Sequence, residues 1–392
     1  RWADLAWGSF YGQSAPQIKL VEDVSSKTGN KVGEAMAKVL RVNGYHRMTD
    51  YWGPIPYSQF GNEELSVSYD TQKDIYANFF TTLDEASSAL SAGGSSFGAS
   101  DRIYGGDGSK WRKLAESLRL RLAMRVKYAD PALSKTQAEK AFSSGQLITD
   151  SDDNAYVSTD GTNKNPLGTI TDWGEFRMSA TMESILKGYD DPRLKEFFDP
   201  AADGDSDGDG NLYEGLQNGQ TKVALGDSKN AGHSDLNINY RNIAKGGINP
   251  PMEVMRASEV HFLLAEAALS GYSVGGTAKQ YYESGIKVSM KERTGASDTD
   301  IDAYIKSDKT PVSFDGGKTP GVSDIPVSFD ESNTEKALEQ IITQKWLAIF
   351  PNGWEAWAES RRTGYPKQYP RIASENEDVP ADKIPSRMVC FK

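Results

Sequence analysis

The chain has 392 residues, 44 lysines and arginines against 55 aspartates and glutamates, and a formal net charge of −11. Such an acidic chain lacks the basic surface that a phosphate backbone needs, which argues against nucleic acid as a partner. The single cysteine, Cys390, excludes a disulfide scaffold. The longest apolar run, residues 260–269, contains Glu266 and is too short to span a membrane. Stability must therefore come from buried apolar surface.

The first part of the chain shows the spacing of amphipathic helices. Apolar residues recur at intervals of three and four along residues 32–49 and 72–90. The same spacing predicts a strong helix over residues 109–128, which Pro131 closes, and a shorter partner over residues 135–142. These segments predict helices in pairs.

The pattern stops in residues 145–250, where Asp, Gly, Asn and Ser dominate. We expect at most two short helices there, over residues 179–186 and 192–198. Long irregular segments inside a compact protein are usually functional. This irregular lobe is therefore the expected place for a binding surface.

Helical periodicity then resumes in four segments, over residues 251–270, 277–293, 334–350 and 353–362. Between the second and the third, the sequence PVSFD occurs twice, at residues 311–315 and 326–330. The repeat predicts either two short strands of a hairpin or a local insertion.

These elements make about four helix pairs, two on each side of the lobe. Stacked helix pairs of roughly 34 residues are the tetratricopeptide plan. We predict a mostly α fold, in which tetratricopeptide-like helix pairs form one helical body with a large irregular lobe. Within a single domain, residues 1–392, the parts are the helical body (32–143 and 251–362), the lobe (145–250) and an insertion (296–333).

No motif in the chain predicts catalysis. GSSFG at residues 94–98 matches a nucleophile elbow, but it lies in a flexible linker composition after a helix instead of after a strand. The three histidines are scattered and no HxxxH or CxxC spacing occurs, so neither a zinc site nor a base-activated nucleophile is expected. Glycan hydrolysis by two carboxylates stays open, because the 55 acidic residues form many pairs.

One acidic segment predicts a metal site. Residues 203–214, DGDSDGDGNLYE, fit the calcium-loop pattern D-x-[DN]-x-[DN]-G-x5-E. Alternating carboxylates direct oxygens at one hard cation, Gly208 permits the sharp turn, and the last glutamate closes the coordination sphere. The eighth position, usually apolar, is Gly210, and no helix is expected to follow. We predict a structural Ca²⁺ ion whose ligands are Asp203, Asp205, Asp207, Asp209 and Glu214.

Several short sequence blocks occur in a characteristic order along the chain. They are DYWGPIPYS at residues 50–58, IYGGD at 103–107, KW and SLRLRLAMR within 110–125, DPRL at 191–194, ASEV and AEA within 257–267, IITQKW at 341–346 and WAESRRTGYP at 357–366. In this order they resemble the blocks of the SusD/RagB family, nutrient-binding lipoproteins of Bacteroidetes outer membranes. The resemblance covers about residues 45–366.

The resemblance implies capture without chemistry, so the protein is not expected to be an enzyme. Family members hold an oligosaccharide or similar nutrient and deliver it to a SusC-like TonB-dependent transporter. They sit on the extracellular face of the outer membrane through an N-terminal lipid. The family's lipidated cysteine has no counterpart here, so we expect an N-terminal part to be missing. The alternatives are a helix-pair scaffold that binds peptides or proteins, and a glycan-degrading enzyme with two carboxylates.

A sugar site needs aromatic rings for stacking and polar groups beside them. Aromatic residues in loops are better candidates than those at helical spacing, because the latter are expected to be buried in the core. The residues selected in this way are Tyr51, Trp52, Trp173, Arg177, Asn239, Tyr240 and Arg241.

Overall fold

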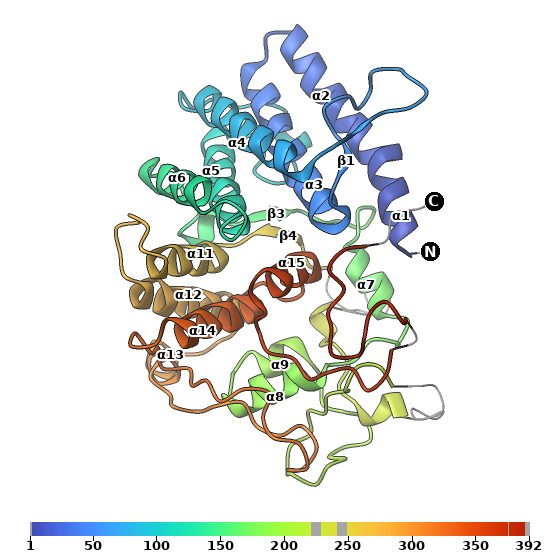
Figure 1. The fold of residues 1–392 in the computed structure, drawn as a ribbon, viewed down its shortest axis with the longest axis vertical. Coiled ribbons are helices and arrows are strands. Elements are labelled where there is room, and N and C mark those ends of the chain that lie inside the picture. Colours follow the sequence, from blue (N-terminus) through green and yellow to red (C-terminus); the bar gives the residue numbers. More distant parts are fainter. Residues whose placement is uncertain (1, 221–228, 241–248, 375, 389–392) are drawn as a thin grey trace.

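The computed structural model describes residues 2–220, 229–240, 249–374 and 376–388. Two residues named above, Arg241 and Cys390, lie outside them. The described chain is mostly α-helical, as predicted. A body of packed helices occupies one end of the molecule, and the irregular lobe with its long loops occupies the other (Figure 1).

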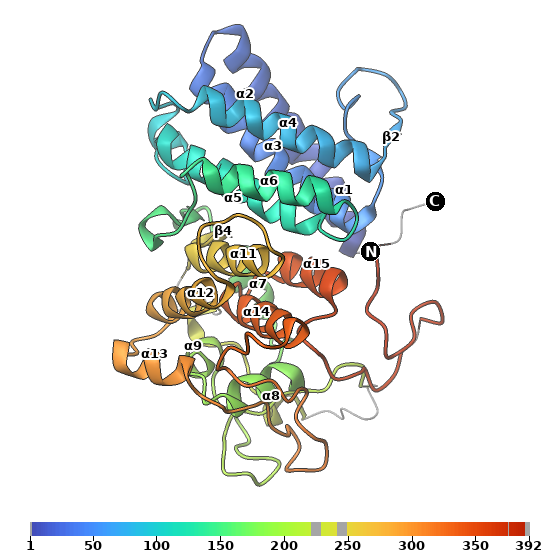
Figure 2. The ribbon, with the colours of Figure 1, turned by 60° about the vertical axis from the view of Figure 1, so that its left-hand side comes forward.

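The first half of the body is built from consecutive helices that lie side by side (Figure 2). They are α1 (Trp2–Ser9), α2 (Ala15–Lys27), α3 (Lys31–Trp52), α4 (Gln72–Ala89), α5 (Gly108–Arg125) and α6 (Pro131–Ser143). A π-helical turn, Phe10–Ser14, joins α1 to α2, and two short paired strands, β1 (Ile55–Pro56) and β2 (Tyr69–Asp70), lie between α3 and α4.

Side-chain caps explain where these helices begin. The Thr71 side chain accepts the N–H of Asp74 at the start of α4, and the Asp107 carboxylate accepts the N–H groups of Ser109 and Lys110 at the start of α5. Each cap satisfies a backbone donor that has no partner inside its helix.

The lobe has little regular structure in its described residues. It contains β3 (Ala155–Val157), α7 (Pro166–Thr171), α8 (Ala180–Gly188) and α9 (Leu194–Phe197), with 3₁₀ turns at Lys229–Gly232 and Ile238–Tyr240. The strand β3 pairs antiparallel with β4 (Met252–Met255), which leads into the second half of the body.

The second half of the body returns to helices. They are α11 (Ala257–Leu269), α12 (Ala278–Arg293), α13 (Asp298–Ile305), α14 (Thr334–Ala348) and α15 (Gly353–Thr363). Helix α11 packs against α12 and α14 and also against α5, so it joins the two halves. Gly364, in the left-handed conformation with φ of 79°, ends α15.

The structure differs from the sequence-based expectations at several elements. The helix predicted from residue 251 begins at Ala257, because Met252–Met255 is strand β4 and pairs with β3. Neither copy of PVSFD forms a strand, so this part of the chain is an irregular insertion. Helices α1, α2, α7 and α13 were not predicted.

Buried ion pairs connect the two halves of the body. Arg121 on α5 forms a bidentate pair with Glu259 on α11, with both N–O distances at 2.7 Å. Arg125, one turn later, contacts Asp50 on α3 at 3.1 Å and Glu355 on α15. All five side chains are buried. Helices far apart in sequence are therefore held by charges that have no access to water.

The same network continues along α14 and α15. Lys345 on α14 lies 3.2 Å from Glu359, and Arg362 contacts Glu266 on α11 at 2.6 and 2.7 Å and Glu359 at 2.6 Å. Buried charges are tolerated only when they are paired and hydrogen-bonded. The arrangement of α11, α14 and α15 is thus fixed by charge as well as by apolar packing.

A second buried pair fixes the lobe to the body. Arg193, just before α9, forms a bidentate contact with Asp191 at 2.9 and 2.6 Å. The same guanidinium donates to Gln344 on α14 at 2.8 Å and to Ser289 on α12 at 3.1 Å. The DPRL segment is therefore an anchor between the lobe and the C-terminal helices.

Removing Arg125 should strongly destabilise the protein. Arg125→Met leaves Asp50, Glu355 and Glu359 without this cation, and loss of one partner of a buried pair costs about 3–5 kcal/mol. The exposed pair between Lys19 and Asp23 is the control, and Lys19→Met should cost less than ~1 kcal/mol. Urea unfolding measures both, and equal losses would contradict the role of the network.

Stability should also fall in mild acid because of His46. This side chain is buried on α3, and burial, together with Arg121 and Arg47, holds its pKa well below 6.5. The histidine therefore takes up its proton only on unfolding, and stability is lost as the pH falls below about 6.5, by up to ~1.4 kcal/mol per pH unit. In urea titrations at pH 7, 6 and 5, His46→Gln should decline less steeply than the parent protein. Comparing the two removes the contributions of other groups, and parallel declines would refute the prediction.

Candidate functional site

The acidic loop of the lobe gathers four of its predicted ligands. Asp205, Asp207, Asp209 and Glu214 each place a carboxylate oxygen so that all four oxygens lie within 4.8 Å of one another. Asp203 is not part of this group, and its N–H donates to the carbonyl of Ala231 at 2.9 Å. Convergent carboxylates are the donor set of a hard divalent cation.

The loop is wound around Asp205 and not around Asp203. The carboxylate of Asp205 accepts the N–H groups of Gly208 at 2.7 Å and Gly210 at 2.8 Å, and these hydrogen bonds lower its pKa. The turn uses positive φ at Gly210, 87°. With Asp205 as the first position, Gly210 becomes the sixth, where a calcium loop needs glycine, and the apolar Leu212 becomes the eighth. Glu214 is then the tenth residue instead of the twelfth, so the loop closes two residues earlier than the pattern requires. The sequence already contained a sign of this start at Asp205, because Gly210 is atypical at the eighth position of the alignment that starts at Asp203.

Glu214 is the buried member of the group. Its side chain is 2% exposed, and burial raises its pKa despite the hydrogen bond that Oε2 accepts from Ser206 at 2.7 Å. Its other oxygen, Oε1, has no hydrogen-bond partner. A buried carboxylate oxygen without a partner costs free energy, and a cation among these carboxylates would remove that cost. The residues present thus fit a divalent cation.

A lysine from α8 reaches the acidic loop. The Nζ of Lys187 lies 2.5 Å from Oδ2 of Asp209 and also contacts Glu183, one turn earlier on α8. Glu183 is fully buried and accepts the N–H of Gly215 at 2.5 Å, and burial raises its pKa to about 8. Burial lowers the pKa of Lys187, but the hydrogen bonds to Asp209 and Glu183 outweigh it, so that pKa is raised.

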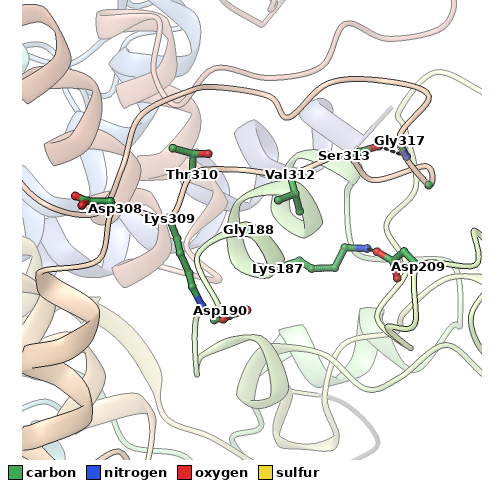
Figure 3. A pocket seen from close by; sticks show the side chains of 11 residues that line it. Lys187, Gly188, Asp190, Asp209, Asp308, Lys309, Thr310, Val312, Ser313 and Gly317 are labelled. Atoms are coloured by element: carbon green, nitrogen blue, oxygen red, sulfur yellow. Dashed lines mark hydrogen bonds and ion pairs between the residues drawn. The ribbon is translucent and has the colours of Figure 1, made fainter.

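A cleft of about 570 Å³ lies between the end of α8 and residues 308–317, which we call the insertion loop. Lys187 and Asp209 meet on one side of the cleft, and Lys309 of the insertion loop points at Asp190 (Figure 3). The loop approaches α8 closely because Gly188 has no side chain, since a Cβ there would lie 2.3 Å from the carbonyl oxygen of Thr310. Charged side chains, glycine backbone and the smaller side chains of Thr310, Val312 and Ser313 line this cleft.

The insertion loop is also attached to the acidic loop. The N–H of Gly316 donates to Oδ2 of Asp207 at 2.7 Å. Two of the convergent carboxylates are therefore connected to residues that line the cleft. Asp209 contacts Lys187, and Asp207 accepts the N–H of Gly316. Nothing in the sequence linked Lys187 or Gly316 to the acidic loop, because both come from distant segments.

Of the predicted sugar-binding aromatics, Trp173 is placed most favourably. It follows α7, and its side chain is 48% exposed. Phe176, which we did not select, is 44% exposed in the same turn. Arg177 does not extend toward solvent, since it donates to the carbonyls of Gly174 at 2.9 Å, Phe176 at 2.7 Å and Asn230 at 2.7 Å. Arg177 thus holds the turn that presents the two rings.

Three other aromatic candidates are packed against neighbours. Tyr240 is 8% exposed and belongs to the apolar core with Phe197 and Phe350, so the expectation of a stacking ring fails there. Trp52 is 1% exposed, and its ring contacts that of Trp7 at 5.4 Å.

Tyr51 is half-buried, with its ring centroid 3.8 Å from that of Trp354 and 4.3 Å from that of Trp357. The DYWG segment is therefore the packed C-terminal end of α3, with Gly53 as its cap. Asn239 is half-buried, and its N–H donates to the side chain of Asn237 at 3.0 Å. Arg241 lies outside the described residues.

Comparisons with known proteins place this site in a family. A family model described as SusD-like, the Susd and RagB outer membrane lipoproteins, matches residues 1–391. A SusD homologue from Bacteroides vulgatus is 35% identical with a TM-score of 0.84, over 96% of this chain and 76% of that one. A SusD-like protein from Bacteroides thetaiotaomicron is 32% identical with a TM-score of 0.83, over 97% of this chain and 78% of that one.

A third solved structure has a title that names a ligand. It is a chitin-binding SusD homologue from Flavobacterium johnsoniae, 35% identical with a TM-score of 0.80, over 92% of this chain and 75% of that one. Among curated proteins, none matches the chain.

Proposed function

Since this chain belongs to the SusD-like family of outer membrane lipoproteins, we propose that it captures an oligosaccharide at the cell surface and delivers it to a SusC-like TonB-dependent transporter. The family consists of nutrient-binding proteins, and one relative is described as chitin-binding. The observation that carries the proposal here is the turn after α7, where Trp173 and Phe176 expose aromatic surface. Exposed rings held in a fixed turn suit the faces of sugar rings.

The proposed location is the extracellular face of the outer membrane, with attachment through an N-terminal lipid. Within the residues that the structure describes, no helix is long and apolar enough to cross a membrane.

The proposed activity is binding without turnover. A two-carboxylate hydrolase is the competing possibility, and it requires one protonated and one ionised carboxyl on either side of a glycosidic bond. Glu183 has a raised pKa, but Lys187 and Gly215 occupy its oxygens, and it is fully buried. It therefore cannot reach a glycan. A scaffold that binds peptides is the other alternative, and ligand screening separates it from sugar capture.

Replacing Trp173 should weaken glycan binding. We expect Trp173→Ala to lose about tenfold or more in affinity, on the order of 1.4 kcal/mol, because a stacking ring is removed. Isothermal titration against chitin, starch and plant oligosaccharides measures this. Tyr128→Ala, which removes another exposed aromatic residue on the helical body, is the control.

Two results would contradict this proposal. Full affinity in Trp173→Ala for a glycan that the parent binds would remove Trp173 from the site. Release of new reducing ends from a bound glycan, abolished by one Glu or Asp substitution, would favour the hydrolase.

We further propose that the acidic loop binds Ca²⁺ through Asp205, Asp207, Asp209 and Glu214 as a structural ion. Four convergent carboxylates repel one another, and Oε1 of Glu214 is buried without a partner, so a cation at this position stabilises the loop. The loop is hydrogen-bonded to the insertion loop through Asp207. The ion would thereby order two long irregular segments of the lobe.

Calcium should raise the thermal stability of the protein, by about 2.7 kcal/mol at a concentration one hundred times the Kd. Asp205→Asn and Glu214→Gln should abolish this gain, whereas Asp203→Asn should keep most of it, because Asp203 is outside the convergent group. Differential scanning fluorimetry in calcium and in chelator measures all three. If Asp203→Asn loses the gain as fully as Asp205→Asn does, the sequence-based alignment of the loop is correct and this one is not.

A further inference from the structure

Lys187 occupies a position between the acidic loop and the cleft. Its side chain is 8% exposed, its Nζ lies 2.5 Å from Asp209, and it also lines the cleft (Figure 3). Asp209 is one of the four convergent carboxylates. The ammonium group is therefore the positive charge that the structure places beside this cluster.

A divalent cation and this ammonium compete for the same carboxylate. A bound ion takes oxygens of Asp209 into its coordination sphere and places two positive charges within a few ångströms of Nζ. The contact between Lys187 and Asp209 is weakened for two reasons. The ion coordinates the carboxylate of Asp209, and it repels the ammonium of Lys187. The flexible stem of a lysine allows the group to turn away.

Glu183 restricts where the ammonium can go. It contacts Lys187 from one turn earlier on α8, is fully buried, and is also held by the N–H of Gly215. An ammonium has three donors, so Lys187 can keep its hydrogen bond to Glu183 while the donor released by Asp209 turns into the cleft. The charge stays at the cleft wall instead of moving into bulk solvent.

The other charges of the cleft have partners that the ion does not touch. Lys309 contacts Asp190, and Asp308 accepts the hydroxyl of Ser328 at 2.6 Å. Lys187 is thus the lining residue whose charge becomes available when the loop binds metal. No aromatic side chain lines this cleft, so recognition there differs from stacking on Trp173.

Building on the calcium proposal above, we propose that Lys187 is the counter-ion of the metal-free acidic loop, that a divalent cation displaces it from Asp209, and that the cleft then binds an anionic group of the ligand. A sugar carboxylate is the chemistry that fits, because the displacement leaves one ammonium donor of Lys187 turned into the cleft. Capture of acidic glycans then depends on calcium at this second site.

The first experiment measures calcium alone by isothermal titration. Lys187→Met should bind calcium about tenfold more tightly than the parent, because the competing cation is gone. Lys309→Met is the matched control and should leave the affinity unchanged, since Lys309 contacts Asp190 and not the cluster. If neither the parent nor the variants bind calcium, the calcium proposal fails. If all bind it equally, calcium stands and the counter-ion role of Lys187 is overturned.

The second experiment uses the unmodified chain, so it does not depend on the folding of a variant. Acylation of lysines, followed by mass spectrometry, should modify Lys187 several-fold faster in calcium than in chelator, with Lys309 equal in both. Glucuronate should slow the modification of Lys187 in calcium, and glucose should not. An unchanged rate at Lys187 overturns the displacement, and equal effects of the two sugars overturn the anion site.

Discussion

The buried ion-pair network between the two halves of the body is the constraint on which the rest of the fold depends. Arg121 and Arg125 project from α5 into carboxylates supplied by α3, α11 and α15. Because each charge is excluded from water, removing any partner leaves the others uncompensated. The helices can therefore assemble in few other ways, although residues 145–250 separate them in sequence. The lobe is held at the edge of this rigid body by Asp191 and Arg193.

The sequence predicted the helices well because their determinants are local. Apolar spacing and capping residues such as Thr71 and Asp107 act within one or two turns. The family resemblance rested on blocks whose charged residues turn out to form the network, Arg121 and Arg125 in one block and Glu359 and Arg362 in another. Their chemistry was visible in the sequence, but their pairing was not, since the partners lie 100 or more residues apart in several cases.

The candidate site was less predictable because exposure and contact are properties of the folded chain. Trp173 and Tyr240 look alike as loop aromatics, yet Phe197 and Phe350 cover only the second. Arg177 was selected as a ligand-binding donor, but backbone carbonyls of its own turn take its hydrogen bonds. The first residue of the acidic loop is the aspartate whose carboxylate accepts backbone N–H groups of the loop. These hydrogen bonds go to Asp205. Such choices follow from tertiary contacts that no local pattern encodes.

The close passage of the insertion loop over Gly188 has a consequence for how this protein can change over evolutionary time. The acidic loop and the insertion loop contact α8 and each other, and the ion-pair network lies elsewhere in the body. Substitutions of cleft side chains can therefore leave the ion-pair network intact. Gly188 and Gly316 are exceptions, because a Cβ at Gly188 would lie 2.3 Å from the carbonyl oxygen of Thr310 and one at Gly316 would lie 2.7 Å from that of Asp207. Side chains of the cleft can thus vary without reaching the ion-pair network, whereas these two glycines keep the insertion loop against α8 and the acidic loop.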